Sequence, residues 1–171
     1  MQRSELAREL ERLHLESWGW ALACCGRDRQ LAEEALQTAY LRILSGRAKF
    51  GGASSVKTWI FGVIRWTALG ELRRRRVRSV RDIDAEAARE VVDSATAPDV
   101  AAERTERRET LIKALAALSR RQREVLHLVF YHDLTIEEAA HVMRVSVGSA
   151  RTHYERGKQA LARKLAREAL R

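Results

Sequence analysis

The chain has 171 residues, 46% hydrophobic and 32% charged, which indicates a folded protein of one ordinary domain or two small ones and argues against disorder. Lysine and arginine number 32 against 23 aspartate and glutamate. The net charge of +9 favours a polyanionic partner, either nucleic acid or an acidic membrane surface, although a merely solubilising surface is the alternative. The absence of a signal peptide or a run of about 18 apolar residues predicts a cytoplasmic protein without membrane insertion.

The first predicted helix covers about residues 3 to 25. Its apolar residues recur at steps of three and four, with arginine and glutamate on the other side: Leu6, Leu10, Leu13, Trp20 and Cys24. The adjacent Cys24 and Cys25 are the chain's only cysteines, which excludes a disulfide framework and a CxxC zinc pair. We interpret them as two small buried side chains, with a redox role as the alternative.

Two more helices complete the first half of the chain. Asp28 is placed to cap the second, whose apolar line is Leu31, Ala35, Leu36, Ala39 and Ile43. Residues 46–55 form a loop with three glycines, and Ser54 or Ser55 is placed to cap a third helix from Val56 to Arg78.

The third helix carries Trp59, Phe61 and Trp66 and leads into four consecutive arginines. Val56, Ile60 and Val63 mark the centre of its buried face. Trp59 and Trp66 lie seven residues apart and therefore flank that face on one edge, whereas Phe61 packs elsewhere. Trp59 is expected to act mostly as scaffold, and Trp66 is either core or a platform for an unpaired base.

Residues 81–108 differ in composition from both flanks. They hold 5 basic and 8 acidic side chains and the only proline, Pro98. By contrast, residues 1–80 carry a net charge of +7 and residues 109–171 a net charge of +5. This pattern predicts an acidic flexible linker between two basic helical modules. Asp82, Asp84 and Glu86 are close enough to raise the alternative of a metal cluster, but the linker explains them better, and we expect neither metal nor catalytic site.

The second module contains two capping boxes, Ser119 with Gln122 and Thr135 with Glu138. A short turn at residues 144–146 precedes a longer amphipathic helix. Two short helices, a tight turn and a third helix are typical of a helix-turn-helix, although a helical hairpin with a solvated charged face is the alternative. The side chains that its last helix would expose to the major groove are Ser149, Arg151, Thr152 and Arg156.

Together the two modules resemble the extracytoplasmic-function group of the sigma-70 family of bacterial RNA polymerase sigma factors. The similarity lies in "LAEEALQTAYLRIL" (31–44), in "SVKTWIFGVIRW" (55–66) with the following "ELRRRR", and in residues 114–165, and covers nearly the whole chain outside the linker. The resemblance implies an all-α fold, with sigma region 2 at 1–80 and sigma region 4 at 109–171. It also implies a protein without enzymatic activity or cofactor that binds core RNA polymerase and promoter DNA, and often an anti-sigma factor. We expect a monomer.

The resemblance assigns site residues to three partners. Core polymerase would be bound by Glu33, Glu34, Gln37 and Leu41. The minus-ten element would be bound by Lys49, Ser54, Ser55, Lys57, Thr58, Trp59, Arg65, Trp66, Arg73, Arg74, Arg75 and Arg76. The minus-thirty-five element would be read by Ser146, Gly148, Ser149, Arg151, Thr152, His153 and Arg156.

Three departures from the family pattern bear on promoter sequence. Trp66 stands where the family usually has asparagine, His153 replaces a frequent arginine, and Gly62 and Gly70 weaken a helix expected to be rigid. Two rival functions are a sigma-like decoy that binds an anti-sigma factor and a helix-turn-helix regulator without sigma activity. The decoy leaves the arginine run unexplained, and the regulator leaves the first module unexplained.

Overall fold

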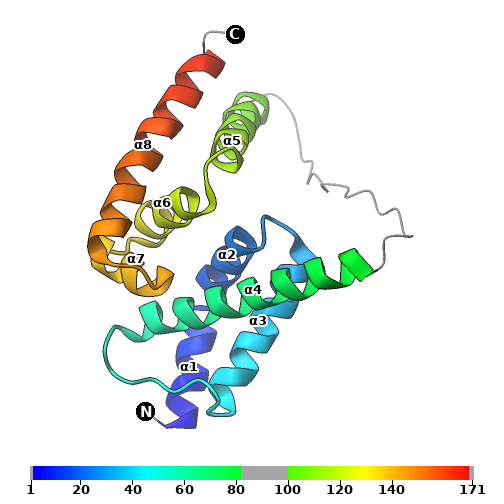
Figure 1. Ribbon diagram of the computed structural model, residues 1–171, viewed down its shortest axis with the longest axis vertical. Helices are drawn as coiled ribbons and strands as arrows, with labels where there is room; N and C mark the ends of the chain where they lie inside the picture. Colours follow the sequence, from blue (N-terminus) through cyan, green and yellow to red (C-terminus); the bar gives the residue numbers. More distant parts are fainter. Residues whose placement is uncertain (1, 82–99, 170–171) are drawn as a thin grey trace.

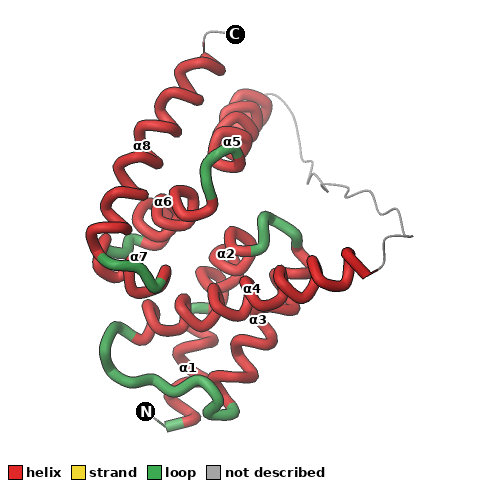
Figure 2. The backbone as a smooth tube through the Cα atoms, in the orientation of Figure 1, coloured by secondary structure: helices red, strands yellow, loops and turns green. Residues whose placement is uncertain are grey.

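The computed structural model describes residues 2–81 and 100–169, and all regular structure within these two ranges is helical (Figure 1, Figure 2). The helices are α1 (Arg3–Arg12), α2 (His14–Cys24), α3 (Arg29–Leu44), α4 (Val56–Arg81), α5 (Val100–Ala116), α6 (Arg120–His132), α7 (Ile136–Met143) and α8 (Val147–Ala169). Helices α1 to α4 form one lobe and α5 to α8 the other (Figure 1). The predicted all-α class is therefore confirmed.

The amino-terminal segment differs from the single helix predicted over residues 3–25. The structure divides it at Leu13, which ends α1 and precedes α2. Leu13 is fully buried together with Trp20 of α2, so the break lies inside the core and not at the surface. Because no glycine or proline marks this point, the apolar spacing alone suggested continuity.

The other local predictions in the first lobe are confirmed by hydrogen bonds. The Asp28 carboxylate accepts from the backbone N–H of Leu31 at 3.0 Å and caps α3. Ser55 Oγ accepts from the N–H of Thr58 at 3.1 Å and caps α4. Between these helices, residues 45–55 form a long loop with positive φ at Gly46 and Gly52.

In the second lobe both predicted capping boxes are present, at Ser119 with Gln122 and at Thr135 with Glu138. Helix α7 ends at Arg144 in the left-handed conformation (φ 53°), and α8 begins three residues later. Helix α5 begins at Val100, inside the segment predicted as linker, and residues 82–99 lie outside the described residues.

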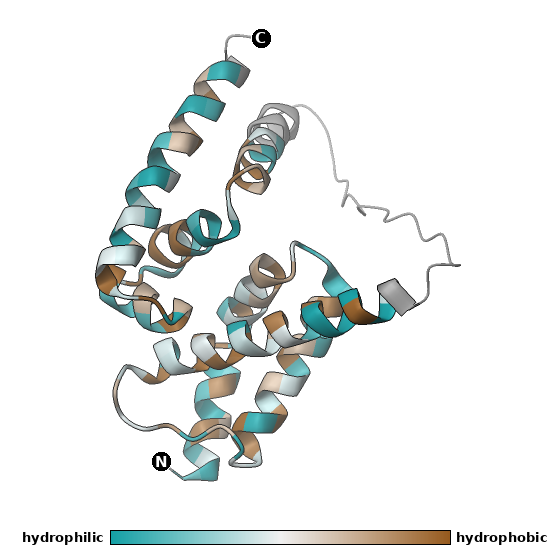
Figure 3. Ribbon diagram, in the orientation of Figure 1, coloured by the Kyte–Doolittle hydropathy of each residue, from teal (hydrophilic) through white to brown (hydrophobic). Residues whose placement is uncertain are grey.

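The two lobes share one hydrophobic core. Helix α4 packs against α7, and α2 packs against α6. Val125, Leu128 and Val142 of the second lobe belong to the same buried cluster as Trp20 and Ile60 of the first. Apolar residues are visible on α6 and α7 in the part of their lobe nearest α2 and α4, whereas α8 is largely hydrophilic (Figure 3). The arrangement of the two lobes is therefore set by burial of apolar surface as well as by chain connection.

Candidate polymerase and nucleic-acid interfaces

The four residues assigned to polymerase binding lie together on the outer face of α3. Glu33, Glu34, Gln37 and Leu41 are all exposed, with 68% of Leu41 accessible. Gln37 Nε2 donates to Glu33 Oε1 at 3.3 Å, which orients both side chains along the helix. An acidic stripe that ends in an exposed leucine combines charge for steering with apolar area for burial, a combination suited to a basic protein partner.

The residues assigned to the minus-thirty-five element lie in the amino-terminal half of α8. Ser149, Arg151, Thr152 and Arg156 are exposed, and His153 is partly buried. Ser146 Oγ accepts from the N–H of Ser149 at 3.1 Å and caps the helix, so these residues project from a rigid helix start. Arg151 and Arg156 add two cationic side chains to this open face, as major-groove binding requires.

A cleft of about 860 Å³ lies beside the residues assigned to the minus-ten element. One wall is formed by the end of α3, the following loop and α4, and it includes Lys49 and Trp59. The opposite wall is formed by the end of α7 and includes Arg144. The loop is held in place because the Phe50 ring packs on Trp59 with a centroid distance of 5.3 Å. Trp59 thus supports the loop while it lines the cleft, in agreement with its expected scaffold role.

Trp66 is the exposed aromatic ring of this cleft, with 45% of the residue accessible. The Arg42 guanidinium carbon lies 4.3 Å from the centre of its ring, in a cation–π contact. An indole with an arginine at its face and cations along the cleft forms an arrangement that can stack a base and hold its phosphate. Sequence reasoning missed Arg42, because its aromatic partner lies far along the chain.

Two other minus-ten candidates, Lys57 and Thr58, are engaged by the second lobe. Lys57 Nζ lies 2.5 Å from Glu16 Oε2 and donates to the backbone oxygen of His132 at 3.0 Å. Thr58 is buried, and its hydroxyl donates to Glu138 Oε1 at 3.4 Å. In this conformation α6 and α7 therefore occupy hydrogen-bonding groups that the sequence assigns to DNA.

Arg65 is buried rather than presented to solvent. Its Nη2 lies 3.0 Å from Glu124 Oε2 of α6, and the side chains are 8% and 4% exposed. Arg120 Nε approaches the other carboxylate oxygen only to 3.9 Å. Sequence reasoning missed Glu124; the available signal was its position four residues before the apolar Leu128, on the same face of the helix.

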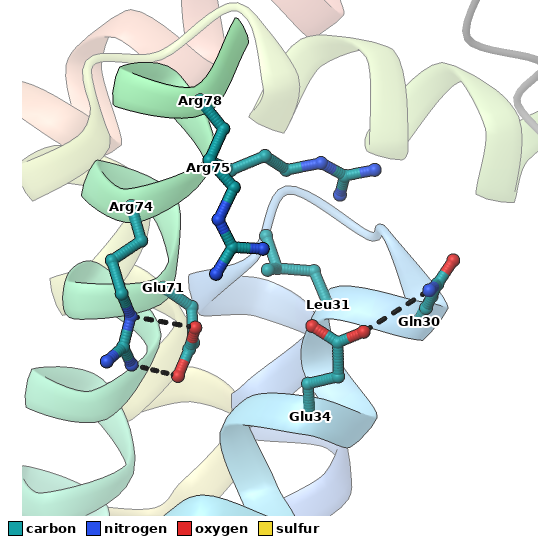
Figure 4. Close-up of a pocket in the computed structure, with 7 residues that line it drawn as sticks. All are labelled: Gln30, Leu31, Glu34, Glu71, Arg74, Arg75 and Arg78. Carbon is teal, nitrogen blue, oxygen red and sulfur yellow. Dashed lines mark hydrogen bonds and ion pairs between the residues drawn. The ribbon is translucent and has the colours of Figure 1, made fainter.

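The arginine run lies along the exposed carboxyl-terminal part of α4. Arg75 Nη1 lies 2.6 Å from Asp28 Oδ2, Arg74 pairs with Glu71, and Arg73 Nε donates to the Leu69 carbonyl at 3.4 Å. Arg76 is exposed as well. Figure 4 shows the pocket of about 160 Å³ beside Arg74, Arg75 and Arg78, with Gln30 hydrogen-bonded to Glu34 on the opposite wall. Because exposed ion pairs are weak, duplex phosphates can compete for these guanidinium groups.

The cysteine pair is part of the core. Burial raises the pKa of Cys24 well above its usual range, an effect to which the Glu124 charge adds, and raises that of Cys25 to about 12. Both side chains therefore remain thiols at neutral pH, which favours packing over redox chemistry. Within residues 2–81 and 100–169, no group of His, Cys, Asp or Glu is arranged to hold a metal ion, and no helix there is long and apolar enough to cross a bilayer. Asp82, Asp84 and Glu86 lie outside the described residues.

Comparison with known proteins gives concordant matches in sequence and structure. Residues 10–78 match the family model of sigma-70 region 2, and residues 108–161 match that of sigma-70, region 4. The chain is 31% identical over 140 residues to the ECF RNA polymerase sigma factor SigX of Bacillus subtilis, which covers 79% of this chain and 71% of SigX. It is 29% identical over 135 residues to the ECF RNA polymerase sigma factor SigF of Caulobacter vibrioides, with coverage of 79% and 71%.

Two solved structures have the same fold. The sigma factor RpoE of Bartonella quintana, solved in complex with the anti-sigma factor NepR, superposes with a TM-score of 0.75 at 20% identity, over 95% of this chain and 97% of that one. CnrH, in complex with the cytosolic domain of CnrY, superposes with a TM-score of 0.63 at 16% identity, over 96% and 90%. Coverage this extensive includes both lobes.

Proposed function

This chain belongs to the extracytoplasmic-function group of bacterial RNA polymerase sigma factors, and from that premise we propose which residues carry each step of initiation. The protein is an alternative sigma factor, not an enzyme: it binds core RNA polymerase, directs it to specific promoters and promotes transcription initiation. The observation that carries this conclusion is the presence of both sigma regions in one chain, in the family's order. Because RNA polymerase acts in the bacterial cytoplasm, we infer that location for this protein.

Polymerase binding is assigned to the exposed face of α3. Reversing Glu33 and Glu34 to lysine removes the charge complementarity that the proposal requires, and affinity for core polymerase is expected to fall. Reversing Glu9 and Glu11, which are also acidic and lie on α1, is the matched control. Equal affinity of the two double variants would refute the assignment.

Recognition of the minus-ten element is assigned to the cleft and to the exposed end of α4. Trp66 would stack on a base of the melted strand, Lys49 and Arg42 would hold neighbouring phosphates, and the arginine run would bind duplex backbone. The exposure of Trp66 and the cation at its face support this assignment.

Recognition of the minus-thirty-five element is assigned to α8, with Ser149, Arg151 and Thr152 facing base edges and Arg156 closer to phosphates. The boundaries of the two functional regions are proposed at residues 1–80 and 109–171, with the intervening segment as linker. The open amino-terminal half of α8 supports the assignment.

An anti-sigma factor is a further proposed partner. The structurally similar sigma factor RpoE was solved with the anti-sigma factor NepR bound, and the structurally similar CnrH was solved with the cytosolic domain of CnrY bound. This resemblance does not favour the decoy over the sigma factor.

The function is tested by adding the purified protein to core polymerase and a genomic promoter pool. Defined transcripts that require the protein are expected, and their start sites would give the promoter sequence. A decoy would yield none but would bind an anti-sigma factor, whereas a regulator would bind duplex DNA without core polymerase and support no initiation.

A further inference from the structure

The cleft between the two lobes is lined by cations, and none of the described residues that line it is acidic. Arg42, Arg47 and Lys49 come from the first lobe and Arg144 from the second. Arg47, Lys49 and Arg144 are exposed, and none of the three forms an ion pair within the described part of the chain. Unpaired cations on opposite walls attract a polyanionic ligand, because the protein does not neutralise their charge.

Arg144 is fixed in the cleft wall by its backbone. It ends α7 in the left-handed conformation, with φ 53°, which residues with a side chain rarely adopt. Its N–H donates to the His141 carbonyl at 3.2 Å, and the N–H of Val145 donates to the Ala140 carbonyl at 3.1 Å. Glycine or asparagine is usual at such a helix end. An exposed arginine there accepts a conformational cost and adds a cation to the cleft.

Two indole rings supply an aromatic surface in the same cleft. Trp59 and Trp66 both line it, and Trp66 is 45% exposed although the Arg42 guanidinium lies at its ring. Gly62, between the two tryptophans on α4, has no atom within 4 Å of the place where a Cβ would lie, which leaves open space beside the rings. Nucleic-acid bases stack on exposed indoles, so the cleft offers both a stacking surface and cations for phosphate.

The cleft volume of about 860 Å³ lies within the range of roughly 300–1,000 Å³ that small-molecule sites occupy. We propose that the cleft binds a free nucleoside triphosphate, with its base against Trp66 and its phosphates between Lys49 and Arg144. The ligand contacts both lobes at once and therefore links them. The site overlaps the surface assigned to the minus-ten element, so a nucleotide and a melted strand compete for it; this consequence rests on the proposed function.

The test is isothermal titration calorimetry of the full-length chain with ATP and with GTP. Adenosine and inorganic tripolyphosphate are titrated separately, to report the contributions of base and phosphates. The variants are Arg144→Gln in the second lobe and Trp66→Leu in the first. Arg121→Gln on α6 is the matched control, because Arg121 is exposed in the same lobe as Arg144 but does not line the cleft.

We expect saturable binding of at least one of the two nucleotides. Arg144→Gln and Trp66→Leu should each weaken it about tenfold or more, and Arg121→Gln should not change it. Absence of saturable binding would overturn the proposal, as would unchanged affinity of either cleft variant. Tripolyphosphate that binds as tightly as the nucleotides, or equal losses in Arg144→Gln and Arg121→Gln, would also overturn it, since net charge alone would then explain the binding.

Circular dichroism checks the folding of each variant. If Arg144→Gln loses helix, Arg144→Asn replaces it, because asparagine adopts the left-handed conformation more readily. Competition is measured by displacement of a fluorescein-labelled random pool of single-stranded DNA. Displacement by the nucleotide that binds supports the overlap with the minus-ten surface, and binding without displacement would refute it.

Failure of the proposed function is distinguishable from failure of the nucleotide site. If the protein supports initiation with core polymerase but binds neither nucleotide, only the nucleotide site is wrong. If it binds a nucleotide through Arg144 and Trp66 but supports no initiation, the sigma function is wrong and the site stands.

Discussion

The amino-terminal halves of α8 and α4 are both assigned to DNA, but the first is open to solvent and the second only in part. On α8, Arg151 and Arg156 are exposed and project away from the core. On α4, Thr58 and Arg65 are buried beneath α6 and α7. Duplex DNA can meet the first surface in the conformation seen here, whereas a melted strand requires a rearrangement before it can use the second in full.

The difference follows from what each helix packs against. Helix α8 packs on α5, α6 and α7. Gly157 permits close approach to α6, because an added Cβ would lie 3.2 Å from Leu126. Helix α4 is enclosed by α2 and α3 on one side and by α7 on another. A central helix contributes more to stability, but its polar side chains become available only when a neighbour leaves.

The largest expected effect comes from breaking the buried ion pair on the α4 side. Arg65→Met leaves Glu124 without its close partner and should lower the free energy of unfolding by about 3–5 kcal/mol. Urea unfolding of the full-length chain measures this value. The double variant Arg65→Met/Glu124→Leu replaces the pair by apolar side chains and should return to wild-type stability or exceed it. A single variant as stable as wild type would show that the pair is not buried in solution.

The open surface is tested by comparing two arginines of α8. Arg151→Ala should relax base preference at one position of the minus-thirty-five element, by about 1–3 kcal/mol of discrimination, because arginine reads guanine edges. Arg156→Ala should weaken binding to all duplex sequences alike. It should also reduce the slope of log affinity against log salt concentration by about one unit. Selection of bound duplexes from a random library measures both. Loss of affinity without changed preference in both variants would refute the division of roles.

The exposed part of the α4 surface is tested at Trp66. Trp66→Ala should weaken binding of melted promoter DNA by about 1–3 kcal/mol and slow promoter opening, since a stacking platform is lost. Because the ring is 45% exposed, the melting temperature should hardly change. Trp20→Ala, the same substitution at a fully buried ring, should instead cost about 3–5 kcal/mol of stability. A large stability loss at Trp66 would mark it as core.

The covered surface should also respond to acid, with a smaller effect. Burial lowers the pKa of His127 to about 4 and lowers the pKa of His132 as well. The exposed rings of separated lobes would bind protons first, so contact between the lobes should weaken as pH falls from about 6.5 toward 4. The charged groups that face the two rings are Glu16, Lys57, Asp133 and Arg27.

Lys57 lowers the pKa of the Glu16 carboxyl, but this attraction joins α2 and α4 within the first lobe and does not itself hold the lobes together. Scattering at pH 7 and at pH 5 measures the effect, with the double variant His127→Phe/His132→Phe as the control. In this variant the two lobes should stay in contact at both pH values. If the double variant is as sensitive to acid as wild type, the effect comes from groups other than the two histidines.

The helix-turn-helix could be predicted because its signals are local. Each capping box places Ser119 or Thr135 three residues before the glutamine or glutamate that completes it, and the structure contains both boxes. The exposed face of α8 follows from the same periodicity that buries Ala150. The assignment of particular residues to polymerase or DNA depended on the family resemblance and remains a prediction.

The contact between the lobes could not be predicted, because its partners lie far apart in sequence. Arg65 and Glu124 are 59 residues apart, and neither side chain signals the identity of its partner. Apolar spacing shows that a helix face is buried but not against which helix, so Val125 and Leu128 indicated a core without indicating that α2 and α4 share it. The break at Leu13 was missed for a related reason, since the residues around it continue a helical pattern.

The separation of the lobes in the free and the bound protein is the most direct test. Dyes placed at Glu11→Cys on α1 and Gln159→Cys on α8 would report it by single-molecule energy transfer, because both positions are exposed while Cys24 and Cys25 are buried. We expect a single high-transfer population in the free chain and a shift to low transfer when core polymerase and promoter DNA are added. The same transfer in both states, high or low, would contradict a separation of the two lobes during initiation.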